Sequence, residues 1–190
     1  FADYLRKAVQ GDFGTSLRYG EGAMALVIER VPATLTLGGV ALALTLLLAV
    51  PLGVLAAVYR GGWVDQAARL VALAAQTVPG FWLATMLILV FSVKLVWLPV
   101  SGATGCRSLI LPAIALAAAP IGDLTRLLRS SMLDAFAQDF VRTAKSKGLP
   151  KAVIVGRHAL RNALLPVVTV IGLSFGALLS GAILTETVFS

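Results

Sequence analysis

Four apolar stretches dominate the chain, and each predicts a helix that crosses a membrane. They cover about residues 32–58, 70–93, 108–128 and 163–185. About 20 predominantly apolar residues suffice to cross the hydrocarbon core. Three of the stretches contain no charged residue, whereas the third contains Asp123 and Arg126. We therefore expect an all-α fold, a polytopic bundle of transmembrane helices that forms a single domain over residues 1–190.

Three of the prolines inside the predicted spans are candidates for helix breaks. Pro79 precedes Gly80 in the second span, and Pro112 and Pro120 lie in the third. Proline removes a backbone hydrogen bond and kinks or breaks a helix, and broken helices can line a translocation path. We therefore take these prolines as candidate helix breaks or pathway positions.

Asp123 is a further candidate pathway residue, because ionisable residues inside a span are often functional. The alternative is an ion pair with Arg126, three residues further on, that reaches the cytoplasmic interface of the membrane. Both interpretations fit the sequence.

A long polar segment, residues 129–162, separates the third span from the fourth. Its first half repeats apolar residues at the spacing of one helix face: Leu133, Phe136, Ala137, Phe140, Val141 and Ala144. We expect Asp134 to cap this helix, Gly148 to end it and Pro150 to begin a second helix. A connection between two spans needs only ~5 residues. Segment 134–161 is therefore predicted to dock a partner protein, with a solvated helical hairpin as the alternative.

The charge distribution orients the predicted bundle. Loops 60–69 and 123–162 hold ten of the sixteen lysines and arginines, and basic residues gather on the cytoplasmic side of membrane proteins. The polar segment 129–162 is therefore predicted to be cytoplasmic and residues 1–30 extracytoplasmic. The net charge of +7, in a chain that is 58% hydrophobic, is explained by this asymmetry, and we expect no nucleic-acid partner.

Residues with catalytic or metal-binding chemistry are scarce. The sequence has one cysteine, Cys106, and one histidine, His158, so we expect no metal site. It contains no phosphate-binding Gly-x-x-x-x-Gly-Lys-Ser/Thr loop, and we expect neither an enzyme nor a bound cofactor. A self-contained channel or secondary carrier is the alternative transport class, but such proteins are expected to carry ionisable residues along their spans.

The sequence from Arg142 to Gly148, RTAKSKG, followed later by Leu165-Pro166, resembles the cytoplasmic loop of bacterial ABC importer permeases. Arg142 and Thr143 replace the Glu-Ala of the general pattern. The chain as a whole is similar to the dipeptide, oligopeptide and nickel branch of these permeases. Further matching strings are GDFGTSL (11–17), ERVPATLTL (29–37), PLGVLAA (51–57), VPGFWLA (78–84) and WLPVSG (97–102).

This resemblance implies a permease subunit of an ATP-driven importer in the bacterial inner (cytoplasmic) membrane. It implies six spans in the full subunit, four of them here, so we expect that the chain is truncated at both ends. The implied partners are the lipid bilayer, a second homologous permease, two ATPase subunits that bind ATP and Mg²⁺, and an extracytoplasmic substrate-binding protein. Di- or oligopeptides are the expected substrates, with nickel or glutathione as the alternative. The implied ATPase-docking coupling helix comprises Phe140, Val141, Arg142, Thr143, Ala144, Lys145, Lys147 and Gly148.

Overall fold

The computed structural model describes residues 13–15, 20, 22–99 and 107–189, and the chain divides into two units, Phe1–Thr36 and Leu37–Ser190. In the first unit, the described residues form the start of helix α2 (Ala23–Val58), and an isolated β-bridge joins Thr15 to Gly22. The second unit contains the rest of α2 and the other described helices, and it positions the candidate site.

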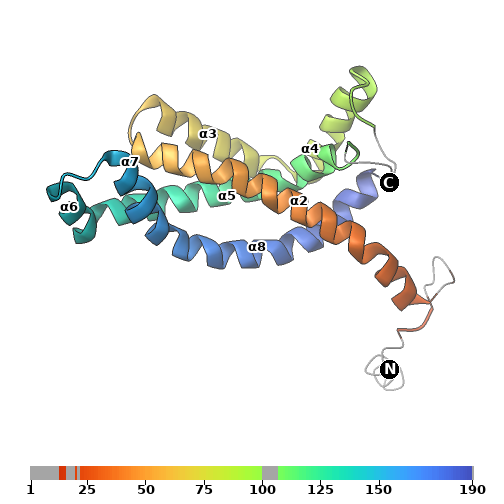
Figure 1. Ribbon diagram of the computed structural model, residues 1–190. Coiled ribbons are helices and arrows are strands. Elements are labelled where there is room, and N and C mark those ends of the chain that lie inside the picture. Colours follow the sequence, from red (N-terminus) through yellow and green to blue (C-terminus); the bar gives the residue numbers. More distant parts are fainter. Residues whose placement is uncertain (1–12, 16–19, 21, 100–106, 190) are drawn as a thin grey trace. The chain divides into compact units, whose positions relative to one another are not determined.

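Helix α5 is the central element of the second unit, and it packs against both α3 and α8 (Figure 1). Two of the segments are π-helical, η1 and η2. The elements that follow α2 are α3 (Trp63–Thr77), α4 (Gly80–Leu87), η1 (Ile88–Lys94), α5 (Ile110–Ala137), α6 (Asp139–Ser146), α7 (Lys151–Val153), η2 (Ile154–Ala159) and α8 (Leu160–Phe189).

Among the described residues, three helical stretches are long and apolar enough to cross a membrane: Ala23–Val58, Ile110–Ala137 and Lys151–Leu179. A fourth candidate is the pair Trp63–Thr77 and Gly80–Lys94, whose two halves meet at an angle of 97°. The described part of the chain is therefore a helical membrane bundle with three candidate spans, or four if the bent pair counts as one.

The three prolines singled out in the sequence differ in their effect. Pro79 lies in the break between α3 and α4, where Val78 and Pro79 are both extended. By contrast, α5 continues through Pro112 and Pro120, so the prediction that these two prolines break the third span is wrong. Pro112 lies in the first turn of α5. Backbone N–H groups there have no intrahelical acceptor, so the N–H that proline lacks costs no helical hydrogen bond. Pro120 removes one hydrogen bond from a helix that packing on both sides supports.

Small residues hold the helices of the second unit close together. The largest core cluster joins residues from α2, α5, η2 and α8: Ala49, Ala57, Leu124, Leu128, Met132, Ala135, Ala159, Ala163 and Val167. At Gly53 of α2, an added Cβ would lie 3.1 Å from the carbonyl oxygen of Thr125 and 3.0 Å from Leu128 Cβ. Glycine and alanine therefore allow the backbones to approach closely, as is typical of membrane helices.

Helix α5 extends further toward the polar segment than the sequence pattern indicates. Asp134 lies inside α5, so the prediction that it caps a new helix is wrong. Met132 and Ala135 are buried in the main core cluster, and this packing continues the helix to Ala137. The interruption comes at Gln138, whose extended backbone (φ −74°, ψ 152°) separates α5 from α6.

Candidate functional site

Helix α6 turns its apolar face toward its own chain. Val141 and Ala144 are 0% and 4% exposed, and they form a small cluster with Ile154 and the half-buried Leu149. The expectation that both residues lie open to a partner is therefore wrong. Because the chain folds back after Gly148, η2 covers the face that the periodicity identified. Only Phe140, 37% exposed, remains open among the three apolar residues of the predicted contact.

Gly148 makes the turn that closes this cluster. Its φ of +71° lies in the left-handed region that favours glycine. The N–H of Gly148 donates to the Lys145 carbonyl at 2.9 Å, and the N–H of Leu149 donates to the Ala144 carbonyl at 3.3 Å. These two bonds are the Schellman arrangement that ends a helix, with Leu149 placed against the last apolar turn. We call residues 138–150, with Ile154, the α6 knuckle.

The outer face of the α6 knuckle is polar and carries a net positive charge. Arg142, Thr143, Lys145, Lys147 and Gly148 are all exposed. Asp139 balances one of the three cations through an ion pair with Arg142 at 3.2 Å, but both side chains are largely in solvent, at 91% and 76% exposed. The face therefore offers Phe140 beside a group of basic side chains.

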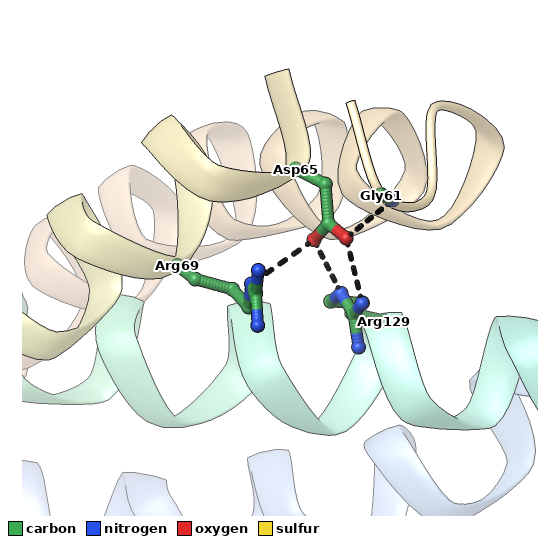
Figure 2. A network of polar contacts seen from close by, with 4 residues as sticks. All are labelled: Gly61, Asp65, Arg69 and Arg129. Atoms are coloured by element: carbon green, nitrogen blue, oxygen red, sulfur yellow. Dashed lines mark hydrogen bonds and ion pairs between the residues drawn. The ribbon is translucent and has the colours of Figure 1, made fainter. Parts of the chain in front are cut away.

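A buried carboxylate joins α3 to α5 (Figure 2). Asp65, 1% exposed, accepts two hydrogen bonds from Arg129, from Nε at 2.7 Å and from Nη2 at 2.8 Å. It also accepts a hydrogen bond from the N–H of Gly61 at 2.9 Å, and Arg69 Nε lies 3.4 Å from Asp65 Oδ1. Such a two-point contact between arginine and carboxylate fixes geometry as well as supplying attraction. We call these four residues the Asp65 anchor.

Asp65 lies in the first turn of α3. Burial takes its carboxylate out of water, and the N–H of Gly61 and the guanidinium of Arg129 replace the hydrogen bonds that water would give.

A second contact joins the start of α7 to Tyr59, the residue that follows α2. Lys151 Nζ, at the start of α7, lies 5.7 Å from the centre of the Tyr59 ring, in cation–π geometry. Ala159 of η2 packs with Met132 and Ala135 of α5 in the main core. Segment η2 therefore packs against both α6 and α5.

Asp123 lies on the exposed side of the contact between α3 and α5. Gln76 Nε2 donates a hydrogen bond to Asp123 Oδ1, and Arg126 Nη2 lies 3.5 Å from the same oxygen. Asp123 and Arg126 are each 51% exposed. The predicted (i, i+3) pair is present, with Gln76 as an additional partner. The role of Asp123 as a pathway residue remains a prediction.

Two interactions of this site were not found from the sequence. Asp65 and Arg129 are 64 positions apart, so no local spacing joins them. The available signal is a single acid, Asp65, between Arg60 and Arg69, and it does not identify the distant partner. The contact between Tyr59 and Lys151 was hidden for the same reason.

The fold and the site together define a class: a polytopic helical membrane protein with an ordered, basic knuckle between two spans. The family described as "Binding-protein-dependent transport system inner membrane component" matches residues 49–190. The chain therefore belongs to this family of transport components, and it is a multi-pass inner-membrane protein.

The relatives and the solved structure agree with this assignment. The chain is 41% identical over 218 residues to the di/tripeptide transport system permease protein DppB of Pseudomonas aeruginosa (strain UCBPP-PA14), covering all of this chain and 65% of the relative. It is 39% identical over 190 residues to the glutathione transport system permease protein GsiC of Escherichia coli (strain K12), covering 100% of this chain and 62% of the relative. The chain thus spans somewhat less than two thirds of these curated relatives.

A solved structure shares the fold. A crystal structure of an amino acid ABC transporter with histidines superposes with a TM-score of 0.65 at 15% identity, covering 86% of this chain and 72% of that one. At this identity the likeness concerns the fold alone, and it agrees with the all-α membrane bundle expected from the sequence.

Proposed function

We propose that the chain is the main part of a permease subunit in an ATP-driven importer of di- or oligopeptides. The observation that carries the proposal is the similarity to DppB over the whole length of the chain, within a family of binding-protein-dependent transport components. In this proposal a second permease completes the path. Two ATPase subunits bind ATP and Mg²⁺, and an extracytoplasmic binding protein delivers the peptide.

The similarity to GsiC at 39% identity supports a second candidate substrate, glutathione. Glutathione is itself a small peptide, so both substrates require a translocation path that accepts a polar, flexible backbone. Uptake of a labelled dipeptide, competed by unlabelled glutathione, separates the two. A system selective for the dipeptide would show little competition.

We infer that the α6 knuckle is where the ATPase docks. Phe140 offers an apolar anchor at 37% exposure, and the exposed Arg142, Lys145 and Lys147 give the same segment a positive charge. An interface of this kind fits a small apolar pocket with an acidic rim, because the charges attract the partner while the aromatic ring supplies burial. Val141 and Ala144 contribute from the inside, by holding α6 against Ile154. This placement implies that residues 129–162 are cytoplasmic and that residues 1–30 lie on the opposite side.

Reconstitution tests the proposed function. The full-length subunit, its partner permease, the ATPases and the binding protein are placed in vesicles, and uptake of the labelled dipeptide is measured. Uptake should require ATP hydrolysis and the binding protein. Uptake that proceeds without ATPase subunits in response to an ion gradient would instead support a secondary carrier and contradict the proposal.

The Gly148 turn gives a residue-level prediction. A Gly148→Val substitution should reduce ATP-dependent uptake at least about fivefold, because left-handed backbone costs an ordinary residue roughly 1–2 kcal/mol and a branched residue more. Gly148→Asn is the matched control, since asparagine tolerates this conformation. It should retain most of the uptake. In the described part of the chain no atom lies within 4 Å of a Cβ added at this position, so a steric clash with that part would not explain a difference between the variants. Equal uptake by the two variants would argue against a required left-handed turn.

A further inference from the structure

An open hollow of about 360 Å³ lies where η2 meets α8, and basic side chains form much of its wall. It is lined by Arg157, His158, Arg161, Asn162 and Leu165. Within the described part of the chain, no carboxylate lies within ion-pair distance of Arg157 or Arg161. The side chain of Asn162 donates to the His158 carbonyl at 2.8 Å, which joins consecutive turns of the wall. The hollow therefore presents two guanidinium groups that no acid of the described chain neutralises.

The same helix face becomes apolar directly beyond the hollow. Leu165 follows Arg161 by four residues and Val168 follows three later, so these positions share one face. Leu165 and Val168 are 70% and 62% exposed. They belong to the stretch Lys151–Leu179, which is apolar enough to cross a membrane. Within the described chain, only 17% of the residues in its most apolar part are buried. The face thus changes from cationic to apolar within about one helical turn.

This order of groups matches one ligand, a phospholipid with a net negative headgroup. We propose that the hollow binds such a lipid, with its phosphate between Arg157 and Arg161 and the start of an acyl chain along Leu165 and Val168. A free phosphate would use only the guanidinium groups and would leave the exposed apolar face unexplained. The proposal rests on the proposed cytoplasmic placement of residues 129–162, because basic groups at this boundary meet the anionic lipids of that leaflet.

Native mass spectrometry of the full-length subunit in detergent tests the proposal, with phosphatidylglycerol and phosphatidylcholine added in equal amounts. The wild type should retain phosphatidylglycerol in preference to phosphatidylcholine. The Arg157→Gln/Arg161→Gln variant should lose affinity for phosphatidylglycerol roughly thirtyfold, since each basic residue near an anionic surface contributes roughly fivefold. The matched control is Arg142→Gln/Lys145→Gln, which removes the same charge from the exposed face of α6 and should retain the lipid.

A second probe separates a lipid site from an anion site. Leu165→Ser should weaken phosphatidylglycerol retention without affecting binding of glycerol phosphate, which has the headgroup charge but no acyl chains. The proposal is overturned if the arginine variant retains phosphatidylglycerol like the wild type, if the α6 control loses it equally, or if glycerol phosphate competes as well as the intact lipid.

A protein contact is the remaining alternative, and it gives a different result. If Arg157 and Arg161 instead bind the ATPase, their loss should abolish ATPase association in vesicles made only of phosphatidylcholine, and lipid retention should be unchanged. The lipid measurement needs neither ATP nor peptide. If the proposed transport function is wrong, the lipid-binding proposal can still hold. If the lipid-binding proposal is wrong, the transport proposal is unaffected.

Discussion

Replacing Asp65 with asparagine should destabilise the protein by about 3 kcal/mol, because removing one partner of a buried ion pair leaves the other charge uncompensated. Asparagine keeps the shape of aspartate but can no longer accept from Arg129 through both oxygens. Arg129 is 20% exposed, so water recovers part of the loss and the lower end of the usual range applies. The apparent unfolding temperature of the full-length subunit should fall by about 6–12 °C.

The surface pair on α6 provides the control. Asp139→Asn removes an acid that pairs with Arg142 at 3.2 Å in an exposed position, and it should change stability by less than about 0.5 kcal/mol. A double variant, Asp65→Leu with Arg129→Met, removes both charges and should recover much of the stability lost by Asp65→Asn. If Asp65→Asn melts at the wild-type temperature, the Asp65 anchor does not stabilise the fold as described.

Substituting alanine for Gly122 should separate α3 from α5. An added Cβ would overlap the carbonyl oxygen of Ala72 and lie 3.3 Å from Gln76 Cβ. A backbone oxygen cannot swing aside as a side chain can, so the helices must move apart, at a cost of about 1–3 kcal/mol. The contact between Gln76 and Asp123 lies one residue away and should be disturbed at the same time. The measurement is the apparent unfolding temperature.

Gly172→Ala is the comparison for this prediction, because no atom of the described chain lies within 4 Å of a Cβ added there. It should be neutral or slightly stabilising, since alanine favours a helix by up to about 1 kcal/mol over glycine. Combining Gly122→Ala with Ala72→Gly should give no rescue, because the obstruction is the main chain of residue 72. Rescue by that pair would mean that side-chain packing, rather than backbone contact, sets the distance between α3 and α5.

The sequence predicted the elements that depend on local composition. Long uncharged stretches predicted an all-α membrane bundle, and the helical fold and the family bear this out. The resemblance to ABC importer permeases is likewise confirmed by the family that matches residues 49–190. These features follow from hydropathy and from strings of adjacent residues, which are visible along a single chain.

Properties that depend on packing were predicted less well. The periodicity identified Val141 and Ala144 as one apolar face, but it could not show that Ile154 covers that face. Helical spacing indicates which residues share one side of a helix, but it does not indicate what packs against that side. Likewise, Pro120 breaks an isolated helix more readily than one supported by neighbours on both sides. Asp65 and Arg129 meet only because α3 and α5 cross, which no local spacing expresses.

The α6 knuckle already has its shape before any partner arrives, because Val141, Ala144, Leu149 and Ile154 form an apolar cluster of their own. A partner that binds it need not order a loose segment. Binding therefore avoids an entropic cost of about 0.5–1.5 kcal/mol for each side chain that would otherwise have to be immobilised. Little apolar area remains to be buried, so long-range attraction by the basic groups would govern encounter. Association should then be fast, readily reversible and sensitive to ionic strength. If the α6 knuckle is the ATPase docking site, as proposed, the docking should therefore weaken as the ionic strength rises.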